Sequence, residues 1–129
     1  MKYLVDTSWT VGHLRGNEEV SQRLLYLGKE GLAVSIISVA ELYEGIFRSR
    51  NPLGDESKLT NFLSGVTVLG INEEICKVFG RERARLRQSG VLIGDLDLLI
   101  ASTALYYSLT LLTADRDFEM VESLTTIFT

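Results

Sequence analysis

Short apolar runs alternate with helical stretches along this chain of 129 residues. The runs are rich in Leu, Ile, Val and Thr, which suit buried strands. They predict strands at 3–5, 32–37, 66–69, 109–113 and 125–128. The stretches between them predict helices at 18–27, 39–48, 55–63, 73–89, 95–107 (or from 96) and 118–123.

Polar residues mark where several of these helices begin. Asn17 and Asn72 are expected as N-caps of the helices that follow them, because an asparagine side chain accepts from a free backbone N–H of the first turn. Ser38 is expected to cap the helix at 39–48, and Asp55 the helix at 55–63. The cluster at 51–55, with its proline and glycine, predicts a turn before that second helix.

Continuously apolar strands separated by helices predict an α/β fold. The expected architecture is a three-layer α/β/α domain with a central parallel sheet of about five strands, buried on both faces. The sequence shows no linker, repeat or low-complexity segment, so residues 1–129 are expected to form a single domain. Ligands of such sheets bind beyond the carboxyl ends of the strands, so residues that follow strands deserve the closest inspection.

The composition narrows the class of protein. Hydrophobic residues make up 46% of the chain and charged residues 23%, as in ordinary globular proteins. A single cysteine allows no internal disulfide, which fits a reducing compartment. The first apolar run ends too early for a signal peptide, and the longest is shorter than the roughly 20 residues of a membrane span. We therefore expect a cytoplasmic protein that does not associate with a membrane.

Charge and histidine content limit the possible chemistry. The formal net charge of −4 disfavours a broad basic surface that coats nucleic acid. A single histidine disfavours a His-rich zinc site, so any metal chemistry must use oxygen ligands. Alternate arginines form a basic stripe on the helix at 73–89, either as a solvated face or as contacts to RNA phosphates or an acidic partner: Arg81, Arg83, Arg85 and Arg87.

Several acidic residues follow strands or begin helices at the predicted carboxyl edge of the sheet. They are Asp6, Glu41, Asp95, Asp97, Asp115 and Asp117. Converging carboxylates repel one another and raise each other's pKa, which is costly unless divalent cations fill the site. Mg²⁺ and Mn²⁺ prefer such all-oxygen ligands. Two such ions about 3.5–4 Å apart support hydrolysis of a phosphodiester by activated water.

Each acid also has a simpler structural interpretation. Glu41 fits a capping box with Ser38, in which the glutamate reaches back to the backbone N–H of the cap. Asp97 would favour the positive end of its helix, and Asp6 would be an ordinary turn residue. Asp95 and Asp117 are each more typical of a helix cap than of a ligand.

Four segments with acidic residues span essentially the whole chain: YLVDTS at 3–8, ISVAEL at 37–42, IGDLDLLIA at 93–101 and LTADRDF at 112–118. Taken together, they resemble the PIN domain of VapC toxins. The resemblance implies a Mg²⁺- or Mn²⁺-dependent endoribonuclease. It maps the catalytic, metal-binding acids onto Asp6, Glu41, Asp97 and Asp115 and a small hydroxyl onto Thr7. Asp95 is an extra acid beside Asp97, and Asp117 competes with Asp115 for the fourth place.

The resemblance also implies partners. A VapB-like antitoxin is expected to lay its tail across the active-site groove, with an arginine that pairs with the carboxylates. Arg81 and Arg85 are the expected contacts to RNA or antitoxin. A homodimer is expected as well. Apolar positions on the early helices would receive an amphipathic partner helix: Trp9, Leu14, Tyr43 and Phe47.

Other functions remain open at this point. A PIN nuclease of RNA maturation that is not a toxin would share the same motifs. A catalytically inactive PIN-like binding module is disfavoured by the complete set of acids. A phosphatase of the haloacid-dehalogenase type needs an aspartate two positions after Asp6, where this chain has Ser8. A receiver domain needs an acidic pair before its phosphorylated aspartate and a late lysine, and the sequence shows neither.

Overall fold

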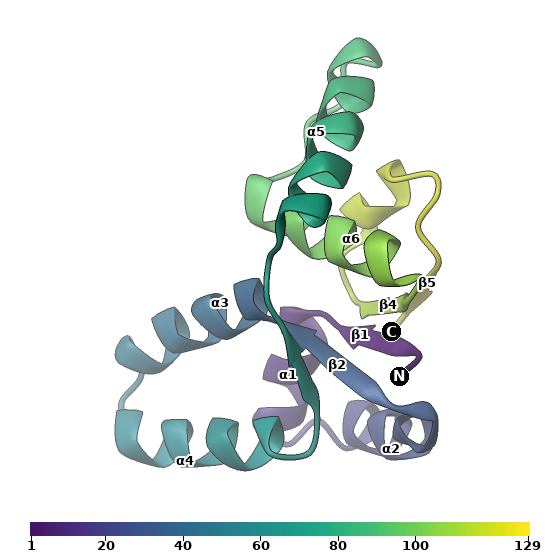
Figure 1. Ribbon diagram of the computed structural model, residues 1–129. Coiled ribbons are helices and arrows are strands. Elements are labelled where there is room, and N and C mark those ends of the chain that lie inside the picture. The colour runs from purple at the N-terminus through teal and green to yellow at the C-terminus, as the bar shows by residue number, and fades with distance from the viewer.

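The computed structural model describes residues 1–129 and contains one five-stranded sheet, all of it parallel (Figure 1). The strand order is β3-β2-β1-β4-β5. From β1 the chain places β2 and then β3 on one side, and it then returns to place β4 and β5 on the other side of β1. The direction of the connections therefore reverses between β1 and β4, and α/β proteins commonly bind ligands at such a position. The strand bounds are Tyr3–Val5, Leu32–Ser35, Thr67–Leu69, Thr110–Thr113 and Thr126–Phe128.

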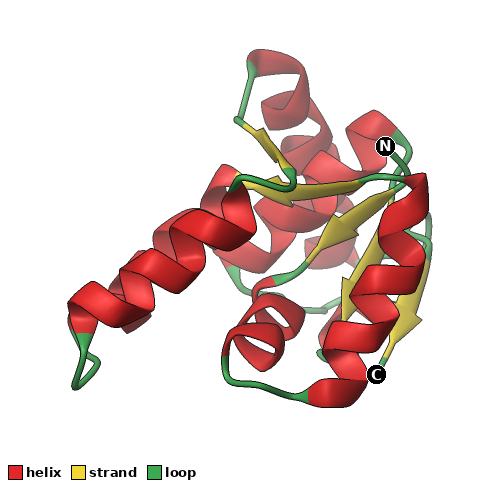
Figure 2. Cartoon of the chain, turned by 90° about the horizontal axis from the view of Figure 1, so that it is seen from below, coloured by secondary structure: helices red, strands yellow, loops and turns green.

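Helices cover both faces of this sheet, which confirms the predicted α/β/α architecture. Helices α1 and α2 lie on one face, and α5 and α6 lie on the other (Figures 1 and 2). Two short 3₁₀ helices, η1 at Gly28–Glu30 and η2 at Arg116–Met120, complete the order. The α-helices span Thr7–Leu14, Glu18–Leu27, Ile36–Phe47, Pro52–Leu63, Glu73–Gln88 and Asp95–Tyr107.

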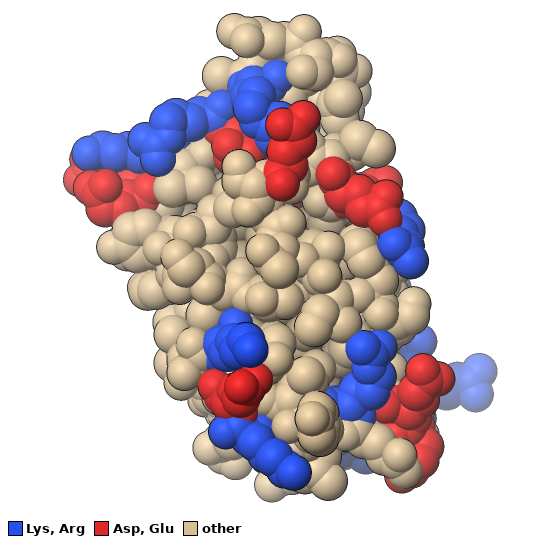
Figure 3. All heavy atoms as spheres, turned by 90° about the vertical axis from the view of Figure 1, so that its right-hand side faces the viewer, with Lys and Arg blue, Asp and Glu red and all other residues tan.

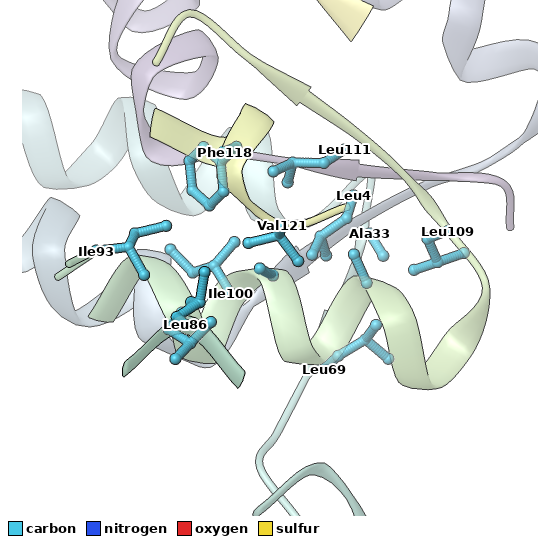
Figure 4. Close-up of a cluster of buried hydrophobic side chains, with 13 residues drawn as sticks. Leu4, Ala33, Leu69, Leu86, Ile93, Ile100, Leu109, Leu111, Phe118 and Val121 are labelled. Atoms are coloured by element: carbon cyan, nitrogen blue, oxygen red, sulfur yellow. The ribbon is translucent and has the colours of Figure 1, made fainter. Parts of the chain in front are cut away.

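The alternation of side chains along each strand divides the core in two. Leu4 of β1 points to the side of α5 and α6, where it packs in a cluster that includes Leu111 and Ile100 (Figure 4). Val5, the next residue, joins the opposite cluster beneath α1 and α2, which contains Trp9. Because successive side chains of a strand point to opposite faces, a strand of three residues serves both cores.

Helices α3 and α4 form an antiparallel hairpin that projects from one side of the sheet (Figures 1 and 2). A small separate cluster holds them together, formed by Leu42, Ile46 and Leu59. Helix α3 begins directly after β2, so its first turns lie at the carboxyl edge of the sheet. No helix of the structure combines the length and the apolar character needed to cross a lipid bilayer.

Two predicted caps, Asn17 and Asn72, are confirmed, and two, Ser38 and Asp55, are wrong. The Asn17 side chain accepts from Val20 N at 3.2 Å, and Asn72 accepts from Ile75 N at 2.9 Å. Helix α3, however, begins at Ile36, and its N-cap is Ser35, which accepts from Ile37 N at 3.0 Å. Ser38 lies inside the helix, so the capping box that would explain Glu41 is wrong.

Other local predictions also need correction. Helix α1, at Thr7–Leu14, was not predicted, because its residues follow the first strand without a recognisable cap; the Asp6 side chain makes no capping hydrogen bond. The expected turn at 51–55 is the start of α4. Asn51 caps that helix through Gly54 N at 3.2 Å, and Pro52 occupies its first turn, where a missing N–H costs nothing.

The face that carries both chain termini shows how charge is distributed away from the carboxyl edge. Acidic and basic side chains lie beside one another around a mostly uncharged centre (Figure 3). Lys2 and Glu30 form one of the ion pairs of this chain, with Nζ and Oε2 3.3 Å apart. No broad basic surface is visible on this face.

Candidate active site

Four separate elements bring carboxylates to the carboxyl edge of the sheet. Asp6 follows β1, Glu41 lies on α3, Asp97 lies in the first turn of α6 and Asp115 follows β4. The negative charges of the other three all help to raise the pKa of Asp97. The structure therefore brings together the four acids named from the sequence, although they are far apart in the chain.

Asp6 is the most deeply buried of these acids, with 4% of its surface exposed. Its Oδ2 accepts hydrogen bonds from Thr113 Oγ1 at 2.7 Å and from Ser8 Oγ at 3.1 Å. Burial raises the pKa of Asp6, the two hydroxyl donors oppose that rise, and the net direction is upward. Asp6 is thus fixed in position by β4 and by the first turn of α1.

Asp97 has the largest pKa shift of the site. Burial and the repulsion of neighbouring carboxylates raise its pKa from 3.8 to about 6. After burial, the contributions in falling order come from Asp6, Asp115, Glu41 and Asp117. A bound cation would reverse this balance, because positive charge favours the ionised carboxylate.

Glu41 is held by a hydroxyl from another helix. Thr7 Oγ1 donates to Glu41 Oε1 at 2.7 Å and lies 3.0 Å from Ser38 Oγ. Thr7 and Ser8, the first two residues of α1, therefore contact two different acids of the site, Glu41 and Asp6. Thr7 was a candidate from the sequence. Thr113 and the role of Ser38 were missed, since a hydroxyl at a strand end or within a helix has no distinctive pattern.

Asp115 and Asp117 differ in their local roles. Asp115 Oδ1 accepts from Asp117 N at 2.9 Å, so Asp115 caps η2 and the prediction that Asp117 is the cap is wrong. The backbone N–H of Asp115 donates to Thr113 Oγ1 at 3.0 Å. One threonine hydroxyl therefore connects Asp115 with Asp6. Both Asp115 and Asp117 contribute to the raised pKa of Asp97.

Asp95 forms an ion pair with Arg83. Its Oδ1 lies 2.6 Å from Nη2 of Arg83, and its side chain is 79% exposed. The N-cap of α6 is Gly94, so the interpretation of Asp95 as a cap is also wrong. Of the two arginines expected to contact RNA or antitoxin, Arg81 is exposed and Arg85 pairs with Glu82 at 2.8 Å.

The donor set fits a hard divalent cation. All candidate ligands are carboxylate or hydroxyl oxygens, which Mg²⁺ and Mn²⁺ prefer. No group of three His, Cys, Asp or Glu side chains already meets the geometry of a metal site. That arrangement is compatible with Mg²⁺, because this ion commonly takes one or two carboxylates and completes its shell with water and phosphate oxygens.

A hollow beside Glu41 lies between α1, α3 and α4. Its apolar lining is Val11, Leu14, Leu42 and Ile46, and its charged residues besides Glu41 are Arg15, Asp55 and Lys58. Leu14 is therefore available to a partner helix, and Phe47 is 73% exposed. The expectation that Trp9 receives a partner is wrong, because its side chain is fully buried in the core.

Known proteins share both the sequence and the fold of this chain. The family model of the PIN domain matches residues 3–124. The chain is 32% identical over 127 residues to Ribonuclease VapC2 of Rickettsia felis, covering 96% of this chain and 95% of that one. It is 35% identical over 124 residues to Ribonuclease VapC19 of Mycobacterium tuberculosis, covering 94% and 95%.

Solved structures give the same result. The chain matches the crystal structure of VapBC2 from Rickettsia felis bound to a promoter DNA fragment with a TM-score of 0.94 and 30% identity, covering 100% of this chain and 99% of that chain. It matches VapBC-1 from nontypeable Haemophilus influenzae with a TM-score of 0.88 and 29% identity, covering 99% and 98%.

The fold, the acidic edge and these matches define the class of protein. The chain belongs to the PIN-domain family. Within that family its similar proteins carry the name ribonuclease VapC, so the resemblance to VapC toxins found in the sequence is confirmed.

Proposed function

We propose that this chain is a metal-dependent endoribonuclease and the toxin of a VapBC toxin–antitoxin pair. The observation that carries the proposal is the convergence of carboxylates from four separate elements at the carboxyl edge of the sheet. Burial and the charges of the neighbouring acids together raise the pKa of Asp97 to about 6. The close similarity to VapC ribonucleases over nearly the whole chain gives that site its context.

The chain's own residues prepare this site. Asp6, Glu41, Asp97 and Asp115 would hold Mg²⁺ or Mn²⁺, with Thr113 and Thr7 fixing Asp6 and Glu41 through the hydrogen bonds described above. When bound, the cation supplies an activated water and offsets the charge of the phosphodiester under attack. The carboxylates need no histidine base for this chemistry.

Cleavage of RNA tests the proposal directly. The purified chain is incubated with total RNA in Mg²⁺ or Mn²⁺, with or without excess EDTA, and the fragment ends are mapped. We expect cleavage that stops with the chelator. Asp6→Asn, Glu41→Gln and Asp97→Asn should each remove most activity while the circular dichroism spectrum stays native. Full activity in excess EDTA would contradict the proposed mechanism.

The antitoxin is the proposed regulator. The similar solved structures are VapBC complexes. The apolar hollow between α1, α3 and α4 has Glu41 in its lining, so an amphipathic helix seated there can direct a basic side chain toward the acids. A PIN nuclease of RNA maturation is the second candidate function. It has the same acids and differs by needing no antitoxin, so expression of the chain alone should leave growth unaffected.

A further inference from the structure

The arginines of α5 lie on two different faces. Residues four positions apart on a helix are neighbours, so Arg83 and Arg87 share one face and Arg81 and Arg85 share another. Arg83 and Arg87 line a hollow formed by α5, the segment after it, the start of α6 and η2. The other residues of this hollow are Leu92, Ile93, Gly94, Asp95 and Asp117.

This arginine hollow adjoins the acidic site. Gly94 lies in its lining, and a Cβ added at Gly94 would stand 3.9 Å from Oδ2 of Asp97. Asp117 lies in the lining too, and its charge is one of those that raise the pKa of Asp97. The arginine hollow and the acidic site are therefore neighbours that meet at Gly94 and Asp117.

Arg83 is fixed in place from two sides. Its side chain is 11% exposed, its Nη2 pairs with Asp95 at 2.6 Å, and its guanidinium carbon lies 5.6 Å from the centre of the Phe79 ring. That pair uses one of five N–H donors. The only buried side-chain polar atoms without a partner belong to Trp9 and Ser49, so the other nitrogens of Arg83 stay in contact with solvent.

Arg87 is exposed and makes no ion pair. Arg85 and Arg116, by contrast, each contact a glutamate three residues away. A guanidinium without a protein partner can bind an anion without first breaking a salt bridge. Its planar array of donors matches the oxygens of a phosphate group.

A nuclease with this site faces an electrostatic difficulty. Its carboxylates and its net charge of −4 repel an RNA strand. A metal ion offsets that repulsion only at the phosphate under attack, and the neighbouring phosphates still need a cation. We propose that the arginine hollow binds an RNA backbone phosphate adjacent to the one that is cleaved, with Arg87 in direct contact and Arg83 as a second donor oriented by Asp95. This inference rests on the proposed function.

Binding of a fluorescent single-stranded RNA to the Asp97→Asn chain tests the inference without cleavage. In that background Arg87→Ala should weaken binding about fivefold to tenfold at low salt and lower the slope of log K against log [salt] by about 0.7, the value for one lost phosphate contact on a single strand. Arg87→Lys should retain most of the slope. The matched control is Lys29→Ala, which removes another exposed cation without an ion pair, in η1 before β2, and should leave affinity and slope unchanged.

The same variants in the active chain give a second readout. Arg87→Ala should raise KM with little change in kcat, because the phosphate contact is made equally in the ground state and the transition state. Equal salt slopes for Arg87→Ala and Lys29→Ala would overturn the inference and leave the proposed function standing. Loss of antitoxin binding with RNA binding intact would also overturn it. If neither the parent chain nor any variant binds or cuts RNA, both this inference and the proposed function are contradicted.

Discussion

Asp97 lies in the first turn of α6, where a carboxylate ordinarily gains from the positive end of the helix. Its pKa is nevertheless raised to about 6, because burial and four neighbouring acids outweigh that gain. This residue shows the cost of the site before any cation binds. Stabilisation of the helix alone therefore does not explain why an aspartate occupies this position.

The raised pKa predicts how stability depends on pH. Asp97 binds its proton more tightly in the folded chain than in the unfolded chain, so metal-free stability should fall as pH rises from about 4 to about 6 and change little above that. The melting temperature in EDTA measures this fall. The asparagine of Asp97→Asn cannot titrate, so the melting temperature of this variant should fall less with rising pH and should lie above that of the parent chain at pH 7. The pKa of Asp6 is raised as well, so part of the pH dependence should remain. Identical pH profiles for both chains would contradict the prediction.

Substitutions of Asp115 and Asp117 can be ranked by how much cleavage activity each should remove. Asp115 caps η2 and is connected with Asp6 through Thr113, whereas Asp117 lies in the lining of the arginine hollow. Asp115→Asn should therefore cost more cleavage activity than Asp117→Asn, about a hundredfold against less than tenfold. Initial rates at fixed Mg²⁺ on one RNA give the comparison. The reverse order would mean that Asp117 is the fourth acid.

At the scale of elements, α1 and α3 are connected at the site by one hydroxyl. Thr7, the first residue of α1, donates to Glu41 on α3 at 2.7 Å. Hydrogen bonds that orient a metal-binding carboxylate contribute to function even though they touch no substrate. The contact is available only because α3 begins at Ile36, which places Glu41 in the second turn of α3, on the side of α1.

This contact predicts the effect of a change at Thr7. Thr7→Val keeps the shape of the side chain and removes the donor, so we expect cleavage or Mg²⁺ affinity to fall about tenfold to a hundredfold. Thr7→Ser keeps the hydroxyl and should retain most of both. Melting temperatures within a few degrees of the parent would show that the fold is intact. If Thr7→Val were fully active, Glu41 would not need this bond.

At the scale of the whole molecule, the acidic site of a toxin must be silenced in the cell that makes it. We expect the chain to form a homodimer and to bind a small antitoxin with a basic tail. Sedimentation at micromolar concentration tests the dimer, and a strict monomer would contradict it. Co-expression with the neighbouring short gene tests the antitoxin, which should co-purify and restore growth. If it does neither, the RNA-maturation function becomes the better proposal.

The order of residues was enough to predict a parallel α/β/α sheet with a group of acids at the carboxyl edge of its strands, among which the resemblance to VapC toxins selected four. Such strands are short, apolar and separated by helices, and their carboxyl ends must meet at one edge. The expectation of one basic stripe on α5 was wrong, because residues two apart on a helix face nearly opposite sides and the four arginines therefore divide between two faces.

Local competition between similar residues was harder to resolve. Ser35 and Ser38 are both residues that favour the N-cap position. Ser35 is the cap in the structure, because β2 ends there and the Ser35 side chain accepts from Ile37 N. Helix α1 had no recognisable cap at all, and its stability comes from burying Trp9 against the sheet. Where a helix begins and whether a short helix forms depend on tertiary packing, which residue propensity and spacing do not describe.

The sequence by itself determined the fold class and the set of acids from which the site is drawn, because residue type and the order of strands and helices along the chain decide both. Only the tertiary structure decided that β1 and β4 are neighbours, so that Thr113 reaches Asp6 across 107 positions of sequence. It alone decided which face of α5 turns toward the site and brings Arg83 and Arg87, rather than Arg81 and Arg85, beside the acids. The physical reason is that these contacts join elements far apart in the chain, and only packing of the whole core fixes their relative positions.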